Sequence, residues 1–231
     1  MIRVGCSDVP AGVARERYCE ALDYVEVPVT MHDPPRPALL SRRRRETPAS
    51  VGLGMVINGF HVGRASGDAM AAISADLGRL QAEVVVFRST AAVTPSAANR
   101  DALRAFFSES APAERMGGAL RAWEPHGLWQ PATAAKLAAE LGLLYVCDPL
   151  ARDPFGPPME FYAGLGEAAY FRLTGLGGGG NDFAQHELEL VAAMAGVYAR
   201  AWLVLTNPGR FRDAVKLRQI VGGGESQPRD G

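Results

Sequence analysis

Three carboxylic acids lie within or at the end of short apolar segments and are the first candidates for chemistry: Glu26, Glu124 and Asp148. Glu26 alternates with valines in the segment Val25-Glu26-Val27-Pro28-Val29, so the valines share one face of a strand and Glu26 lies on the other. A buried carboxylate is costly unless it is paired or solvated. Glu124 and Asp148 end neighbouring segments and could share one proton. These three acids are the predicted catalytic acid–base groups.

Arg172 is the predicted partner of Glu26. It alternates with Phe171 and Leu173, so its side chain lies on the face of the strand opposite to theirs. Its planar guanidinium can donate two parallel N–H bonds to a carboxylate or an anionic ligand. Two interpretations stay open here, a buried structural ion network and a ligand-binding site. Asp148 likewise has an alternative as the acceptor of an Asx turn, because Pro149 follows it. The side chains predicted to contact substrate beside Arg172 are His61, Thr174 and Asn207.

A glycine-rich stretch follows Thr174 and contains four consecutive glycines, Gly177–Gly180. Backbone N–H groups of such a loop before a helix can approach a phosphate closely. Gly177, Gly178 and Gly179 are therefore predicted to bind substrate. Since the stretch matches neither GxxxxGK[ST] nor GxGxxG, a hinge or simple linker is the alternative.

Metal and nucleic-acid sites have weaker support. A metal site would need His61 or His126 to converge with the carboxylates from separate segments, because the chain has no HxxxH or HxH spacing. We name no metal ligand, and a divalent metal stays open as a cofactor. The 24 basic and 25 acidic residues give a net charge of −1, so general nucleic-acid binding is not expected. The run Arg42–Arg45 is interpreted as a solvated helix end, with a local nucleic-acid or acidic-partner contact as the alternative.

Eight short segments rich in apolar and β-branched residues must position these groups. With 231 residues they recur about every 29 residues, near the length of a strand–helix–strand repeat. This alternation predicts an α/β fold, a TIM-like (β/α)8 barrel with one or two helices short or absent; the alternative is a doubly wound open parallel sheet. The predicted strands are Ile2–Cys6, Tyr24–Val29, Val51–Ile57, Val84–Phe87, Leu120–Trp123, Leu143–Cys147, Tyr170–Leu173 and Trp202–Thr206.

Helical periodicity is clearest over Gly67–Gln81. Further helices are predicted after Pro95, from Pro131 to a stop at Gly142, over Phe183–Ala199 with a cap at Asp182, and after Asn207-Pro208. The signal is weak after the first two strands, and residues 153–166 are predicted to form a loop. Residues 1–221 are predicted to form a single domain and residues 222–231 a disordered tail.

Cysteine use and the N-terminal segment predict a cytoplasmic location. Cys6, Cys19 and Cys147 have unrelated spacings, which disfavours a disulfide framework or a CxxC motif. The opening MIRVGCSDVP lacks the apolar region of a secretory signal, and no stretch of about 18 apolar residues predicts a membrane span.

Several of these segments, in the same order, resemble the YecE-like family (domain of unknown function 72), particularly its shorter forms. The resemblance implies a TIM-barrel-like fold and implies no established activity. Thr174 stands where the family often has His, and the loss of that His removes a natural general base. His126 stands where Arg is common. The matching stretches are Ile2–Ser7, Val25–Val27, Ala122–Trp129, Val146–Leu150, Tyr170–Gly175, and Thr206–Pro208 followed by Asp213-Ala214.

The predicted function is that of a hydrolase or lyase that acts on a small anionic or phosphorylated compound at the carboxyl ends of the strands. One alternative is a non-catalytic protein that binds a ligand or partner in the same pocket. Another is a metal-dependent phosphoesterase, by analogy of fold alone. A small anionic ligand is the expected partner, no membrane is expected to be one, and no oligomeric state is predicted.

Overall fold

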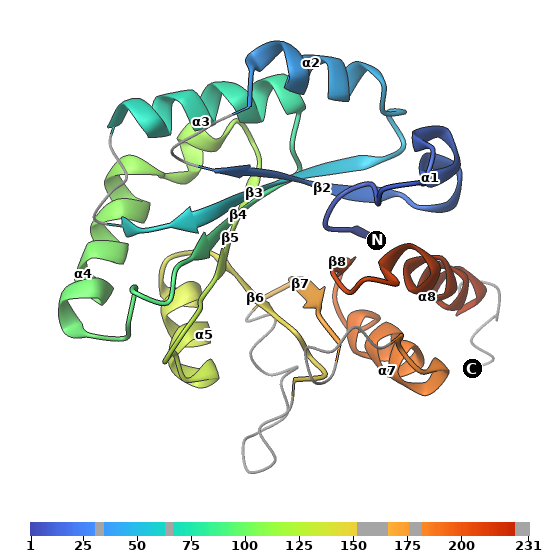
Figure 1. Cartoon of the computed structure of the whole chain (residues 1–231). Coiled ribbons are helices and arrows are strands. Elements are labelled where there is room, and N and C mark those ends of the chain that lie inside the picture. The colour runs from blue at the N-terminus through green and yellow to red at the C-terminus, as the bar shows by residue number, and fades with distance from the viewer. Residues whose placement is uncertain (31–34, 63–66, 152–165, 176–181, 225–231) are drawn as a thin grey trace. The chain divides into compact units, whose positions relative to one another are not determined.

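Eight parallel strands follow one another in chain order and close into a barrel (Figure 1). The computed structural model describes residues 1–30, 35–62, 67–151, 166–175 and 182–224. Closure is visible in the register of β1 with β8, which runs from Ile2 opposite Ala201 to Cys6 opposite Leu205. The predicted barrel is therefore confirmed, and the open sheet is wrong. Strands buried on both faces read as continuous apolar runs, which is why the sequence located them.

The chain divides into two compact units, residues 26–146 and residues 1–25 with 147–231, and each is described by itself. The first unit, here called the central unit, contains most of β2, most of β6 and the elements between them; the last residue of β6, Cys147, belongs to the other unit. Figure 1 shows its helices α2 and α3 side by side, in keeping with their contacts. Its elements are β2 (Tyr24–Thr30), α2 (Pro37–Arg45), β3 (Gly52–Phe60), α3 (Gly67–Leu80), β4 (Val84–Ser89), α4 (Ala97–Ala105), the π-helical turn η2 (Phe106–Ser110), the 3-10 turn η3 (Ala113–Met116), β5 (Leu120–Glu124), α5 (Pro131–Glu140) and β6 (Leu144–Cys147).

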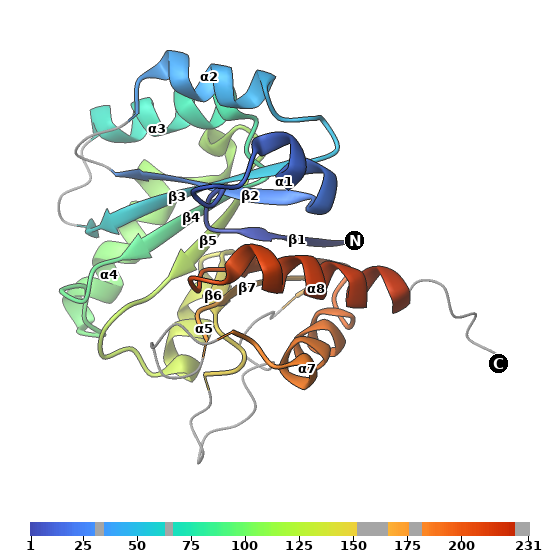
Figure 2. The ribbon, with the colours of Figure 1, turned by 45° about the vertical axis from the view of Figure 1, so that its right-hand side comes forward.

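The second unit, here called the terminal unit, joins the two ends of the chain through the β1–β8 pairing. Helices α7 and α8 lie side by side, as Figure 2 also shows, and α8 packs against β1 and β8. Tyr18, Tyr24, Tyr170 and Trp202 are buried in its core. Its elements are β1 (Ile2–Cys6), α1 (Arg15–Ala21), β7 (Ala168–Leu173), α7 (Gln185–Ala195), β8 (Arg200–Leu205) and α8 (Arg210–Gly224).

The predicted start of the helix after the glycine-rich stretch is wrong by two residues. Helix α7 begins at Gln185, and the carboxylate of Glu187 accepts the backbone N–H of Ala184 at 2.8 Å. Asp182 is not the cap, because its carboxylate pairs with Arg212 of α8. Tertiary contact with α8 therefore overrides the local capping signal.

Two helices form where periodicity is weak, and one continues past its predicted end. Helices α1 and α2 are short, and the last turn of α2 is Arg42–Arg45, as predicted for that run. Helix α8 continues to Gly224, so residues 222–224 are not a disordered tail. Residues 225–231 and most of the predicted loop at residues 153–166 lie outside the described residues. Within the described ranges, no helix combines the length and apolarity needed to cross a bilayer.

Candidate functional site

The carboxyl ends of β4 and β5 bring an arginine, a glutamate and a histidine together in the central unit. Arg88 and Glu124 are opposite each other in the strand register, and Arg88 Nε lies 3.3 Å from Glu124 Oε2. Arg88 Nε also donates to His126 Nε2 at 3.0 Å, and that nitrogen lies 3.3 Å from Glu124 Oε1. The Glu124 side chain is 12% exposed, whereas Arg88 and His126 are 38% exposed. The carboxylate is thus recessed behind two side chains that reach solvent.

These distances fit two placements of one proton. When His126 is neutral, its Nε2 accepts the Arg88 proton and its own proton sits on Nδ1. When His126 Nε2 carries a proton instead, Glu124 Oε1 is the acceptor within its reach, and Arg88 Nε faces the other carboxylate oxygen, Glu124 Oε2. The cluster therefore places a histidine and a carboxylate, two side chains that general acid–base chemistry commonly uses, beside a fixed cation.

An open pocket of about 480 Å³ adjoins this cluster. Among the described residues, the terminal nitrogens of Arg88 have no hydrogen-bond partner, because its contacts to Glu124 and His126 both use Nε. Four N–H donors in a planar fork are therefore available at the pocket. The lining residues come from the ends of β3 and β4 and from the loops after β4 and β5: Asn58, Gly59, Arg88, Ser89, Thr90, Ala91, His126 and Gly127.

Buried tryptophans hold Ser89 of the pocket wall and the loop that follows it. Trp123 on β5 donates its indole N–H to Ser89 Oγ at 2.7 Å, and Trp129 donates to the carbonyl of Val93 at 2.5 Å. Gly127 has a φ of +85°, and a Cβ there would lie 3.0 Å from the carbonyl oxygen of Ala91. A side chain at position 127 would therefore push apart the loops that carry His126 and Thr90.

Asp148, a predicted catalytic acid, uses both carboxylate oxygens inside the terminal unit. Oδ1 accepts the backbone N–H of Leu150 at 3.0 Å, which confirms the Asx-turn interpretation. Oδ2 accepts both the backbone N–H of Thr174 at 2.8 Å and its hydroxyl at 2.7 Å. Asp148 thus links the end of β6 to the end of β7. Thr174, a predicted substrate contact, donates both its backbone N–H and its hydroxyl to this carboxylate.

Asn207, another predicted substrate contact, is buried at the end of β8. Its Nδ2 donates to Asp213 Oδ2 at 2.8 Å, and the same oxygen accepts the backbone N–H of Phe183 at 3.2 Å. Asp213 is completely buried. The amide and the acid together hold the first turn of α8 against β8 and the segment before α7, which is a structural task.

The remaining predicted residues divide by burial and by placement. Glu26 is completely buried on β2 and Arg172 is 7% exposed on β7, and neither lacks an interaction partner. They belong to different units, so their pairing stays a prediction. His61 is half-buried after β3, and its Nδ1 is buried without a hydrogen-bond partner among the described residues. Gly177, Gly178 and Gly179 lie outside the described residues.

No group of three or more His, Cys, Asp or Glu side chains is placed to hold a metal ion within the described ranges. Glu124 and His126 supply two such groups, and both contact the Arg88 guanidinium. A cation at this point would meet that positive charge at close range, so the cluster suits an anion better.

The predicted site residues do not include Arg88, and His126 is predicted only as a possible metal ligand. Their signal was present in the sequence, because Arg88 and Glu124 end consecutive strands and His126 follows Glu124 by two positions. Adjacent parallel strands place such ends side by side. Charge alternation predicts a role for Arg172 instead, although burial makes Arg172 the less accessible of the two arginines.

Comparison with known proteins gives the fold. No protein-family model and no curated protein sequence matches the chain. A DUF72 family protein from Enterococcus faecalis has a TM-score of 0.71 at 13% identity, covering 96% of both chains. A DUF72 family protein from Thermotoga maritima has 0.69 at 15% identity, covering 98% of this chain and 100% of its own. A xylose isomerase domain containing protein from Salmonella typhimurium has 0.57 at 12% identity, covering 97% and 96%. Over nearly its whole length, this chain therefore has the barrel fold of solved DUF72 family proteins.

Proposed function

We propose that this protein is a YecE-like barrel protein that binds a small anionic compound through Arg88 and moves a proton with the Glu124–His126 pair. The observation that carries the proposal is the Arg88 side chain, whose Nε is held by Glu124 and His126 while its terminal nitrogens stay open at the pocket. The family proposal is supported by the order of the sequence motifs and by the shared fold.

The chemistry follows from the placement of charge. Arg88 would fix an anionic group of the ligand by two parallel N–H···O bonds. His126 and Glu124 would then donate or accept the proton that a lyase or hydrolase transfers at a neighbouring atom. Preorganised donors at the edge of a recessed site also favour negative charge that develops during such a step.

A thermal-shift screen of small carboxylates and phosphates tests the binding step. We expect at least one anion to raise the melting temperature, and Arg88→Gln to weaken its binding about tenfold or more, since it removes the charge and the fork of donors. Arg100→Gln is the control, because Arg100 in α4 does not line the pocket. A screen with no stabilising anion, or an unchanged response of Arg88→Gln, would overturn the proposal.

A non-catalytic binding protein is the second candidate, and Asp148 favours it. Both oxygens of this acid are used by Leu150 and Thr174, so the terminal unit supplies no free carboxylate at that strand end. Incubating the protein with the stabilising anion and following it by NMR separates the candidates. Conversion that Glu124→Gln abolishes while binding persists supports catalysis; binding without conversion by the unmodified protein supports the second candidate.

A further inference from the structure

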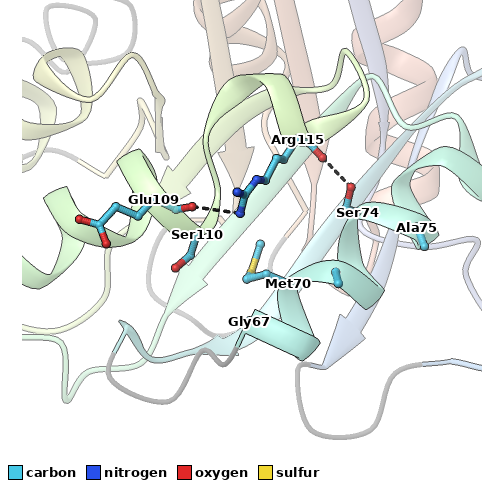
Figure 3. A pocket seen from close by; sticks show the side chains of 8 residues that line it. Gly67, Met70, Ser74, Ala75, Glu109, Ser110 and Arg115 are labelled. Carbon is cyan, nitrogen blue, oxygen red and sulfur yellow. Dashed lines mark hydrogen bonds between the residues drawn. The ribbon is translucent and has the colours of Figure 1, made fainter.

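A second cavity, of about 560 Å³, lies in the central unit between α3 and the turns η2 and η3 (Figure 3). No strand contributes to its wall, and none of its lining residues lines the pocket beside Arg88. It is therefore a separate site on the helical layer of the unit. Its lining residues are Gly67, Met70, Ala71, Ser74, Ala75, Glu109, Ser110 and Arg115.

Arg115 brings one positive charge to this cavity and is held in place from two sides. Its backbone carbonyl accepts the Ser74 hydroxyl at 2.6 Å, and its NH1 donates to the carbonyl of Glu109 at 3.1 Å. Figure 3 shows the Glu109 carboxylate pointing away from the guanidinium. Within the described part of the chain, Arg115 has no ion pair, so its remaining N–H donors carry an unneutralised charge.

The π-helical turn η2 creates this geometry. Ala111 donates its backbone N–H to the carbonyl of Phe106 at 2.9 Å, five residues back, which widens the end of the helix. Phe106 and Phe107 are both buried against Phe60 and Phe87 by this turn. The Glu109 carbonyl then lies at the helix end, where it needs a donor and finds Arg115. Single π-turns of this kind are frequent at functional sites.

The other wall of the cavity is apolar. Met70 is buried, and its side chain extends from α3 toward Arg115 and Ser110 (Figure 3). Ala71 and Ala75, which also line the cavity, are exposed. A methionine adapts its shape to an apolar guest. A cavity of this size falls within the range of small-molecule sites, which combine mostly apolar walls with few polar anchors.

We propose that this cavity binds a small amphipathic carboxylic acid. The carboxylate pairs with Arg115 and accepts the Ser110 hydroxyl, and the hydrocarbon body lies on Met70 and Ala71. Among the described residues of the lining, Arg115 is the single basic one, so its charge matches a singly charged carboxylate better than a dianionic phosphate. This site is independent of the anion proposed at Arg88.

Binding measurements with octanoate, octanol and acetate separate the contribution of the carboxylate from that of the hydrocarbon chain. We expect octanoate to shift the methyl resonance of Met70 in protein labelled with ¹³C at its methionine methyl groups, the signal being assigned with Met70→Leu. Octanol lacks the charge and acetate lacks the apolar body, so each should bind about tenfold more weakly or worse. Equal binding of octanol, or octanoate shifts confined to other methionines, would overturn the proposal.

Two variants on the same helix test the location without touching Arg115. Ala71 and Ala72 are both exposed residues of α3, but only Ala71 lines the cavity. We expect Ala71→Phe to fill the space and abolish octanoate binding, and Ala72→Phe to leave it unchanged. Arg115→Gln should weaken binding about tenfold if the variant remains folded. Equal octanoate affinity of Ala71→Phe and Ala72→Phe would show that the acid binds elsewhere.

Discussion

The strand ends of the two units carry similar polar residues and use them differently. In the central unit, Arg88 and His126 share the Glu124 carboxylate and still present unused donors at a pocket. In the terminal unit, Asp148 and Asn207 direct their side chains into bonds that hold loops and helices. A polar residue at the end of a barrel strand is therefore not by itself evidence of catalysis. What distinguishes Arg88 and His126 is unused hydrogen-bonding capacity that is exposed at a pocket, whereas the Oδ1 of Asn207, unpartnered among the described residues, is buried.

Asp213→Ala should produce the largest effect on stability. The change removes a completely buried acceptor and leaves the Asn207 amide and the Phe183 N–H without a partner. We expect the free energy of unfolding to fall by about 3 kcal/mol. Urea denaturation measures this loss. Asp101→Ala, which removes an exposed ion pair with Arg104, is the control and should change it by less than about 0.5 kcal/mol. A loss as small as the control's would mean that Asp213 is not structural.

Asp148→Ala should cost less than Asp213→Ala but leave anion binding intact. It removes the acceptor for Leu150 and Thr174 at a partly exposed position, and we expect a loss of about 1.5 kcal/mol. Arg88→Gln should show the opposite pattern, with little change in stability and a large loss of anion binding. Urea denaturation and anion-binding measurements on both variants check this pattern. Loss of anion binding in Asp148→Ala, with binding retained in Arg88→Gln, would contradict the assignment of binding to the central unit and of structure to Asp148.

Thr90→Val should stabilise the protein slightly. The Thr90 hydroxyl is buried at the pocket wall and, among the described residues, has no hydrogen-bond partner. Replacing it by a methyl group of similar shape removes an unsatisfied group, worth about 1 kcal/mol. Thr47→Val is the matched control: its hydroxyl donates to the Arg43 carbonyl at 2.7 Å, so the same change should destabilise. Melting temperatures that move in one direction for both variants would contradict this account.

Thiol labelling should report how closed the end of β6 is. Burial raises the pKa of the Cys147 thiol, so it stays protonated and unreactive at pH 8. Cys19 in α1 is half-exposed. We expect iodoacetamide to modify Cys19 in the folded protein and Cys147 about tenfold more slowly or only on unfolding. Peptide mass spectrometry follows both sites, and rapid labelling of Cys147 would show that the neighbouring Asp148 region opens.

Local sequence located the elements because their signals are local. The stripe of Met70, Ile73 and Leu77 predicted α3, and Pro131 and Gly142 marked the limits of α5, where Gly142 adopts a φ of +64°. The start of α7 was misplaced because Asp182 has a stronger tertiary partner in Arg212 than any local one. Here an ion pair with a residue far along the chain overrides the local capping signal.

The sequence by itself determined the alternation of strands and helices, and with it the barrel, since period-two and period-3.6 patterns are written in neighbouring residues. It also placed Glu26 and Arg172 correctly among the buried polar side chains. Only the tertiary structure decided which strand-end residues remain chemically available. The hydrogen bonds from Thr174 to Asp148 and from Phe183 to Asp213 join residues whose positions are set by folding. Whether a carboxylate is spent on the fold or left for a ligand depends on those long-range contacts, which residue types and spacing do not encode.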